Sequence, residues 1–408
     1  MRKINPHDFH VATRSTSRDI NRRIALNLIR EHQPISRADL ARQMRVTRSI
    51  ISVLVGELIT EGLICEGATG EAARGRKPTF LHLMTRGKLC VALDVRLSRT
   101  FMLLSDFSGH QLALEEFSTI ADSSALVKDL AHRIRRMLES HSATARCEGI
   151  GVSVPGMVDH RTGHILNAPT LGWKQVDLGS ALSEATGFPV HIENAAKACV
   201  LAQTWLSGGR ASTANSFVHV SVSDGVGVGI VFNGELVRGH DNTAGEFGHV
   251  PLNLEGPKCM CGARGCWEAY VSNIATLSRY FGRDLSKVPP KPFVEANGHS
   301  FTVDDLVARA RSGDGKAMSA VNTTAKYLGL GLATVINALN PDCVFIGGEI
   351  TTAWDLIESI VRSSLAERTL TESASRTPIH IAAAVERPRL RGAAALVAAP
   401  TFAAPRVA

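Results

Sequence analysis

Three cysteines and one histidine lie close together near the middle of this 408-residue chain, where they could bind a metal. His249 is followed by Cys259, Cys261 and Cys266. One imidazole and three thiolates match a closed four-ligand zinc site in type and number. The glycines at 262 and 265 permit the tight backbone that such a knuckle needs. Four protein ligands leave no open position, so we expect a structural Zn²⁺; a fortuitous cluster of cysteines is the alternative.

The elements that must position this cluster follow an α/β pattern. Apolar β-rich runs predict strands at 90–95, 100–105, 111–117 and 149–154, with a helix near 125–140 before the last of them. The order recurs, with strands 216–221 and 226–232, a helix near 266–272, helices through 304–338 and the strand 343–346. Two such units predict a duplicated α/β body with a cleft between its lobes.

The excess of basic over acidic residues in this chain is confined to its N-terminal region. Residues 1–90 hold 16 Lys and Arg against 8 Asp and Glu, whereas the 318 residues that follow hold 29 against 30. A basic region in front of a neutral body is typical of nucleic-acid binding, because Lys and Arg release counterions from phosphates. A solvated basic surface is the alternative when the charge is taken alone.

Three short helices are predicted in this basic region. Apolar residues recur at intervals of three and four over 19–31, Ser36 is suited to cap a second helix, and Thr47 a third that ends at Gly62. The tight turn before the third helix predicts a helix-turn-helix, whose third helix enters the major groove. The candidate DNA contacts at this helix are Arg45, Thr47, Arg48, Ser49 and Ser52.

Two strands at 63–66 and 79–83 are predicted to form a hairpin, joined by a glycine-rich basic loop at 67–78. This loop has the character of a wing, because a glycine between arginines lets a basic segment lie close to a narrow minor groove. Its candidate contacts are Arg74, Gly75, Arg76 and Lys77, and a solvated turn is the alternative. We therefore predict an N-terminal arm at 1–17 and a DNA-binding winged helix-turn-helix at 18–86.

With these features the chain resembles the ROK family (repressors, open reading frames and sugar kinases) almost from end to end. The resemblance rests on the winged helix, the two-lobed body and the motif Cys-x-Cys-Gly-x-x-Gly-Cys-x-Glu at 259–268. It implies two actin/hexokinase-like (ribonuclease H-like) lobes: a first at 87–200, completed by 375–400, and a second at 201–374 with the zinc knuckle at 245–268. The winged helix points to the repressor branch.

The resemblance also implies a set of sugar ligands, namely Asn167, Asn194, Glu246, His249 and Glu268. Carboxylates, amides and an imidazole together satisfy hydroxyl groups that both donate and accept hydrogen bonds. Two of these residues have simpler alternatives, because Asn167 could hold a turn and Asn194 could cap the following helix. We expect His249 to place one ring nitrogen on zinc and the other toward the sugar.

The phosphate-binding and catalytic positions of the family's kinases are altered in this chain. The first phosphate loop, Asp-x-Gly-Gly-Thr, is represented by Asp94-Val95-Arg96-Leu97-Ser98, and the second, Gly-Thr-Gly, by Ser223-Asp224-Gly225. Ala195 stands where these kinases carry the aspartate that accepts the hydroxyl proton, and a methyl group cannot accept one. Gly347-Gly348 is retained, but a strand-to-helix turn also explains it. We therefore expect no catalytic residues.

The combined expectation is a sugar-responsive DNA-binding regulator, most simply a repressor that a sugar or sugar derivative releases from a palindromic operator. A homodimer or a dimer of dimers is expected, because two recognition helices must meet half-sites about 34–36 Å apart. The alternatives are an active ATP-dependent sugar kinase with an appended DNA-binding domain, and a transcriptional activator. A cytoplasmic protein without a membrane partner is expected, because no apolar run reaches about 18 residues and no signal peptide is apparent. The Ala- and Pro-rich residues 393–408 predict a frayed helix and tail.

Overall fold

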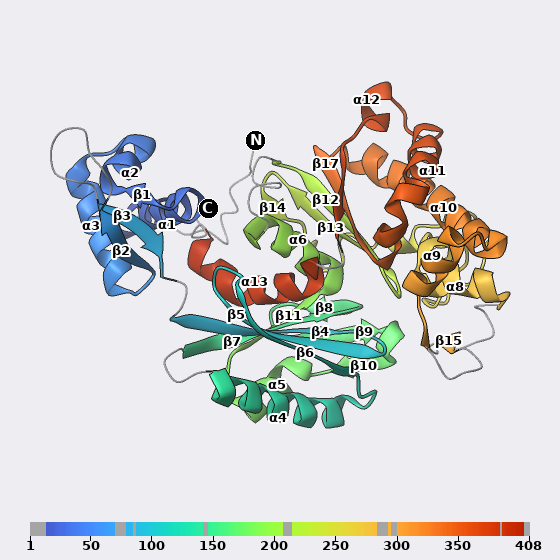
Figure 1. Ribbon diagram of the computed structural model, residues 1–408, viewed down its shortest axis with the longest axis horizontal. Helices are drawn as coiled ribbons and strands as arrows, with labels where there is room; N and C mark the ends of the chain where they lie inside the picture. Colours follow the sequence, from blue (N-terminus) through green and yellow to red (C-terminus); the bar gives the residue numbers. More distant parts are fainter. Residues whose placement is uncertain are drawn as a thin grey trace.

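The computed structural model describes residues 14–69, 79–84, 87–141, 146–206, 214–283, 293–294, 300–383 and 386–403. The chain forms three parts: a small N-terminal head and two α/β lobes that meet along a pair of helices (Figure 1). Among the described residues no helix combines the length and the apolar character needed to cross a bilayer.

The head contains three helices and a small antiparallel sheet of strand order β1-β3-β2. Its elements are α1 (Arg14–His32), β1 (Ile35–Ser36), α2 (Arg37–Met44), α3 (Arg48–Thr60), β2 (Ile64–Thr69) and β3 (Thr79–Leu83). The predicted helix-turn-helix is present as α2 and α3, and the hairpin as β2 and β3. The Ser36 hydroxyl accepts a hydrogen bond from the backbone N–H of Asp39 at 3.2 Å and so caps α2 as expected.

Two details of the head differ from the sequence expectation. Helix α1 begins at Arg14, within the segment predicted to be an arm at 1–17. The first turn of α1 has no apolar stripe to reveal it, and Arg18 is instead paired with Glu57 of α3. Thr47 precedes α3 in extended conformation but makes no side-chain cap, because its hydroxyl is hydrogen-bonded to that of Ser49 at 2.9 Å.

The first lobe is built on a five-stranded sheet of order β11-β7-β4-β5-β6. Its strands are β4 (Lys88–Val95), β5 (Arg99–Asp106), β6 (Gln111–Ser118), β7 (Arg146–Val154) and β11 (Val190–Asn194). Alternate residues of β4 face opposite sides. Leu89, Val91 and Leu93 pack with α4 (Ser123–His141), whereas Cys90 and Ala92 pack with α13 (Pro388–Phe402). The sheet is therefore covered on both faces.

The rest of the first lobe adds elements that the sequence reading did not predict. Helix α5 (Leu178–Thr186) lies beside α4, and a second small sheet of order β10-β9-β8 carries the segment that contains Asn167. Its elements are β8 (Met157–Asp159), β9 (His164–Ala168), a 3-10 turn η1 (Pro169–Leu171) and β10 (Trp173–Val176).

The second lobe repeats the plan of the first with a sheet of order β14-β13-β12-β17-β18. Its strands are β12 (Phe217–Val222), β13 (Val226–Phe232), β14 (Glu235–Leu236), β17 (Cys343–Gly348) and β18 (Ile379–Ala382). In both lobes three antiparallel strands are followed by two parallel ones. This recurrence confirms the duplicated, actin/hexokinase-like fold.

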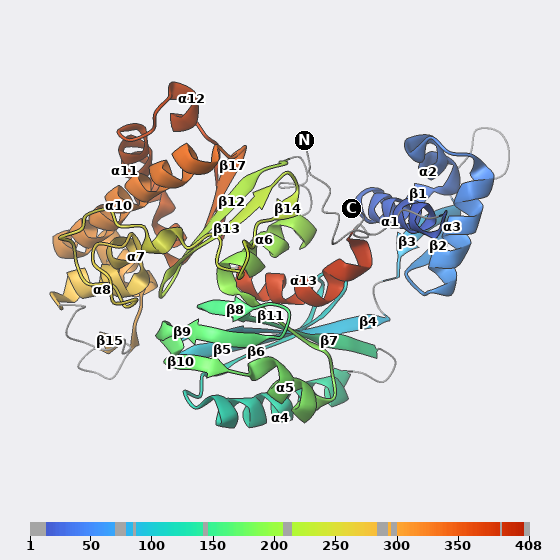
Figure 2. The same ribbon diagram turned by 180° about the vertical axis from the view of Figure 1, so that it is seen from behind.

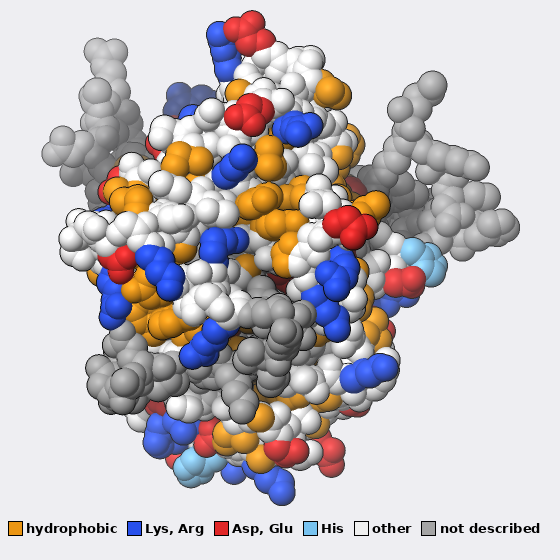
Figure 3. Space-filling view, turned by 90° about the vertical axis from the view of Figure 1, so that its right-hand side faces the viewer, with side chains coloured by type: hydrophobic (Ala, Val, Ile, Leu, Met, Phe, Trp, Pro, Cys, Tyr) orange, Lys and Arg blue, Asp and Glu red, His pale blue; other side chains and the backbone are white. Residues whose placement is uncertain are grey.

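Helices and short elements cover the outer face of the second sheet. They are a 3-10 turn η2 (Phe247–His249), α7 (Glu268–Val271), α8 (Asn273–Phe281), β15 (Phe293–Val294), β16 (Ser300–Phe301), α9 (Val303–Arg311), α10 (Gly315–Leu339), a 3-10 turn η3 (Glu349–Ala353), α11 (Trp354–Ala366) and α12 (Glu372–Ser375). The face of the molecule on this side mixes basic and acidic side chains, as expected for a body of nearly neutral charge (Figure 3).

Helices α6 (Ala195–Leu206) and α13 pack against each other between the two sheets (Figure 2). The expected boundary at 374/375 is wrong, because β18 still pairs with β17 of the second lobe and only α13 returns to the first. The expectation of a frayed C-terminal helix is also wrong, since Ala393, Ala394 and Ala395 are buried. Small residues allow this close packing: a Cβ on Gly392 would stand 1.8 Å from the carbonyl oxygen of Ala198.

Candidate functional site

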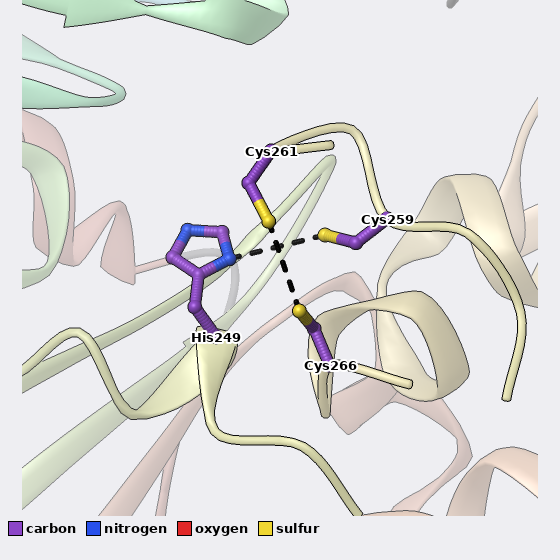
Figure 4. Close-up of side chains that lie close together, drawn as sticks. All are labelled: His249, Cys259, Cys261 and Cys266. Atoms are coloured by element: carbon purple, nitrogen blue, oxygen red, sulfur yellow. Dashed lines mark hydrogen bonds between the residues drawn. The ribbon is translucent and has the colours of Figure 1, made fainter. Parts of the chain in front are cut away.

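The four predicted metal ligands come together in the second lobe (Figure 4). His249 is the last residue of the short turn η2, and the three cysteines lie on the loop that leads into α7. The ligand atoms of His249, Cys259, Cys261 and Cys266 all lie within 4.8 Å of one another.

The spacing of these atoms fits a tetrahedral ion. With bond lengths of about 2.3 Å to sulfur and about 2.0 Å to nitrogen, two thiolates on Zn²⁺ lie about 3.8 Å apart and a thiolate and an imidazole nitrogen about 3.5 Å. The Sγ atoms of Cys261 and Cys266 are 3.7 Å apart, and Cys259 Sγ is 3.8 Å from His249 Nδ1. Burial raises the pKa of the Cys266 thiol to about 11, so a cation is needed to hold it as a thiolate near neutral pH.

A cavity of about 110 Å³ lies between the lobes, directly beside this cluster. The N-terminal end of α6 forms one wall, and the segments around Glu246 and Glu268 form the other. Four of the five predicted sugar ligands line the cavity, namely Asn194, Glu246, His249 and Glu268. Asn167 does not; its place is taken by Pro169 and Thr170, which follow it in the chain. Asn167 itself lies on β9, paired with Lys174 and Met157 of the small sheet.

His249 connects the cluster to the cavity. Its Nδ1 atom faces Cys259, while its Nε2 atom lies 3.8 Å from the carboxylate of Glu246. Burial raises the pKa of the Glu246 carboxyl, although His249 opposes this shift. Glu268 uses one carboxylate oxygen to accept from the backbone N–H of Val226 at 2.8 Å, and its other oxygen lies 3.4 Å from Cys259 Sγ. The carboxylate of Glu246 is thus placed beside His249, whereas that of Glu268 is held by the backbone at Val226.

Asn194 both caps α6 and faces the cavity. Its side-chain oxygen accepts from the backbone N–H groups of Ala196 and Lys197, at 2.9 and 3.3 Å. Its amide nitrogen donates to the carbonyl oxygen of Gly156 at 2.8 Å. The helix-cap alternative for Asn194 is therefore correct, and its position in the cavity wall leaves a ligand role open.

A buried network behind Asn194 was not anticipated from the sequence. Glu193 is fully buried and accepts from the backbone N–H of Asn194 at 2.9 Å and from the side chain of Asn242 at 3.1 Å. Its second oxygen is paired with Arg238 at 2.6 Å. Lys197, also buried, donates to the carbonyl oxygen of Asn242 at 2.5 Å, and burial lowers its pKa. The adjacent pair Glu193-Asn194 was the only signal for this network, which fixes the wall of the cavity across both lobes.

The positions that bind phosphate in the family's kinases hold ion pairs instead. Asp94 is paired with Arg96 at 2.8 Å and with Arg389 at 2.9 Å, and Arg96 reaches Glu349 of the second lobe at 2.8 Å. Burial raises the pKa of the Asp224 carboxyl, and the nearby Glu349 raises it further. Arg96, Asp224, Glu349 and Arg389 line a second cavity of about 380 Å³ that adjoins the first.

Two other residues of the kinase comparison fit the sequence reading. Ala195, whose side chain is a methyl group, is among the residues that line the smaller cavity. Gly348 adopts a φ of +106° at the end of β17, and a Cβ there would stand 1.7 Å from the carbonyl oxygen of Val222. The local turn therefore requires a glycine at this position without any bound nucleotide.

The candidate DNA contacts at the third helix lie on the surface of the head. Arg45 ends α2 in left-handed conformation, and Arg48, Ser49 and Ser52 are exposed on α3, with Thr47 exposed at its start. The buried side of α3, formed by Ile51, Leu54, Val55 and Leu58, packs into the core of the head. The wing contacts predicted at Arg74, Gly75, Arg76 and Lys77 lie outside the described residues.

Comparison with known proteins agrees with this architecture. The sequence profile of the ROK family matches residues 90–399. The chain belongs to the ROK family.

Within this family, the chain is 29% identical to the xylose repressor of Bacillus subtilis over 364 residues, which cover 88% of this chain and 89% of the repressor. A crystal structure of a ROK family transcriptional regulator, a homologue of the Escherichia coli Mlc protein, aligns with 95% of this chain and 97% of its own, with a TM-score of 0.77 and 26% identity. A ROK family glucokinase from Streptomyces griseus, solved with glucose and AMPPNP, covers 98% of its own chain but 76% of this one, with a TM-score of 0.64. At 24% identity the glucokinase supports the fold of the body alone.

Proposed function

We propose that this ROK protein is a sugar-responsive transcriptional repressor whose head binds operator DNA and whose body binds a sugar. The observation that carries the proposal is its similarity to ROK repressors along nearly the whole chain, the head included. The replacement of the catalytic base position by Ala195 supports a binding rather than a catalytic role for the body.

The sugar occupies the cavity beside the metal cluster. Glu246 and Glu268 accept hydrogen bonds from its hydroxyl groups, and Asn194 and His249 supply both donor and acceptor atoms. Asn167 contributes only if the small sheet of the first lobe moves toward the cavity when the sugar binds. Glu193 holds the backbone N–H of Asn194, and the cap that Asn194 makes with Ala196 of α6 holds its side chain.

His249, Cys259, Cys261 and Cys266 hold a structural Zn²⁺ in this proposal. The ion supplies the positive charge that stabilises three thiolates and fixes the loop between η2 and α7. With its Nδ1 atom directed to the cluster, His249 presents its Nε2 atom toward Glu246 and the sugar. The geometry of the sugar site thus depends on the integrity of the cluster.

Helix α6 offers a direct route from the sugar to the DNA-binding head. Its first residues line the cavity, and Trp205 near its end lies 6.5 Å from the ring of Phe402. The guanidinium of Arg30, on α1 of the head, lies over both rings, at 5.1 and 5.0 Å. A 12-residue helix spans about 18 Å. Closure of the lobes around a sugar moves α6 and α13 together and so changes the position of the head.

Operator binding requires two heads in this proposal, because a palindromic site presents two half-sites about 34–36 Å apart. The functional unit is accordingly a homodimer or a dimer of dimers. Movement of each head relative to its body changes the distance between the two recognition helices. A coupling of about 1–3 kcal/mol changes operator affinity by about 5- to 150-fold.

A gel-shift series with the DNA upstream of its own gene, with and without common sugars, tests the proposal. We expect a retarded complex that is lost when one sugar is added. The same sugar at 100 times its dissociation constant should raise the stability of the body by about 2.7 kcal/mol in a thermal-shift screen. Tighter binding in the presence of the sugar would identify an activator or a corepressed system instead.

The alternative of an active sugar kinase has its own test. A coupled assay of ADP release with a panel of hexoses should give no turnover above background. Turnover at about 1–100 per second, the range of typical kinases, would refute the non-enzymatic role.

A further inference from the structure

The solvent-facing side of the recognition helix α3 carries an exposed apolar side chain. Val53 is 56% exposed, the highest value among the large hydrophobic residues of the head that the structure describes. It lies between Ser49 and Gly56, which are four residues before it and three after it, so the three share one face of the helix. The core residues Ile51 and Leu58 lie on the opposite side.

The charges around this face favour DNA as its partner. Arg45 and Arg48 are exposed at the N-terminal end of α3. The two acidic residues near its C-terminal end are turned toward α1, where Glu57 is paired with Arg18 and Glu61 with Arg22. The exposed face of α3 is therefore apolar and uncharged around Val53, and basic residues lie at the N-terminal end of the helix.

The shape of the helix surface also suits close approach to a groove. A Cβ on Gly56 would have no atom within 4 Å, so this part of the helix has neither a side chain nor a neighbouring element above it. Val53 is β-branched, and in a helix its χ1 angle has one strongly preferred value. Its methyl groups are thus held in a fixed position on an open surface.

We propose that Val53 contacts the C5-methyl group of a thymine in the major groove, so that each operator half-site carries an A·T pair at this position. The inference rests on the proposed DNA-binding function and adds the chemistry of one base contact. Among the four bases of DNA, thymine alone presents a methyl group in the major groove, and an apolar side chain is the partner that distinguishes it. Serines and arginines of the same face hydrogen-bond to phosphates and base edges.

The test uses DNA that differs only in the thymine methyl group. A binding fragment is selected from random DNA with the full-length protein and is synthesised once with thymidine and once with deoxyuridine throughout. Dissociation constants are measured at one salt concentration for the wild type and for Val53→Ala. The matched control is Ile24→Ala, because Ile24 is 43% exposed in the same head but lies on α1, outside the recognition helix.

The wild type should bind the deoxyuridine fragment about four-fold more weakly for each methyl group contacted, and about 15-fold more weakly when two heads bind. Val53→Ala should weaken binding to the thymidine fragment and lose this discrimination, whereas Ile24→Ala should retain it. The thymine methyl group also changes the stiffness of the DNA, but this effect is the same for every protein variant. Comparing the ratio of the two dissociation constants between variants therefore removes it.

Three results would overturn the inference. Equal affinity of the wild type for both fragments would show that no methyl group is read, while leaving the DNA-binding function intact. Full discrimination by Val53→Ala would assign the contact to another residue. A change in oligomeric state caused by Val53→Ala, measured by light scattering, would assign this face to a second copy of the chain. Failure of the wild type to select any DNA would reject the proposed function itself.

Discussion

The junction between head and body offers the sharpest test of how a bound sugar could reach the DNA. Phe402, the last residue of α13, is 6% exposed and belongs to the hydrophobic core of the head, although the rest of its helix packs in the body. Hydrogen bonds fix the same junction: Arg23 donates to the carbonyl oxygen of Pro400 at 2.7 Å and Asn27 to that of Phe402 at 2.8 Å. Burial lowers the pKa of Arg30, whose guanidinium is stacked on the Phe402 ring.

We predict that Phe402→Ala separates the sugar response from DNA binding. Truncation of a buried Phe costs about 3–5 kcal/mol, and loss of the cation–π contact with Arg30 costs about 0.5–2 kcal/mol more. A loss of about 3 kcal/mol in the docking of the head lowers the ratio of docked to undocked molecules by about 150-fold. The head then samples positions that no longer depend on the state of the lobes, and the sugar-induced change in operator affinity should fall below about three-fold.

The assay is fluorescence anisotropy with operator DNA, with and without the sugar identified by thermal shift. Sugar binding to the variant, measured by calorimetry, should be unchanged, because Phe402 does not line the cavity. Phe232→Ala is the matched control: Phe232 is 52% exposed on β13, so the same chemical change removes little packing. A full sugar response in Phe402→Ala would refute the proposed route through α6 and α13. A loss of sugar binding would show instead that α13 is needed to fold the body.

Four further predictions follow from the site and the core. Glu246→Ala should weaken sugar binding about 10- to 100-fold in calorimetry, because a hydrogen bond to a charged group is worth about 1.5–3 kcal/mol; operator affinity should stay unchanged, and its loss would make Glu246 structural. Cys266→Ser, or treatment with a chelator, should release about one equivalent of Zn²⁺ and weaken sugar binding through His249; sugar affinity unaffected by metal loss would contradict the coupling. Arg76→Ala should reduce the salt dependence of operator binding by about one unit of log–log slope, and an unchanged slope would argue against its phosphate contact. His219 is fully buried on β12, and its ring nitrogens have no hydrogen-bond partner within the described part of the chain. Burial lowers the pKa of His219 from 6.5 to about 3. Between these two pH values the unfolded chain binds a proton at this residue and the folded chain does not. Stability to urea should decrease by about 1.4 kcal/mol per pH unit below pH 6.5 from this residue; His219→Leu should remove that part of the slope, and an unaltered pH profile would disprove it.

The sequence by itself determined the features that depend on neighbouring residues. The strands β4, β5, β6, β7, β12, β13 and β17 were predicted because their apolar runs pack on the faces of the sheets, as Leu89 and Cys90 do, whereas β11, β14, β18 and the small sheet were not. The metal cluster was predictable because its four ligands fall within one short segment, and the cap at Ser36 because it involves a residue three positions away. The exposed positions on the third helix followed from its apolar stripe in the same way.

Only the tertiary structure decided which distant segments meet. Arg96 bridges to Glu349 across 253 positions of sequence, and Asn27 of the head bonds to Phe402 across 375, and no local pattern records such pairs. Helix α13 was misjudged because its small residues are buried on several sides, which leaves no amphipathic stripe to detect. Asn167 was assigned to the cavity by family resemblance, yet its position depends on how the small sheet packs, and the structure places Pro169 and Thr170 there. Local periodicity fixes which face of an element is buried, whereas the element that covers this face is selected by packing over the whole chain.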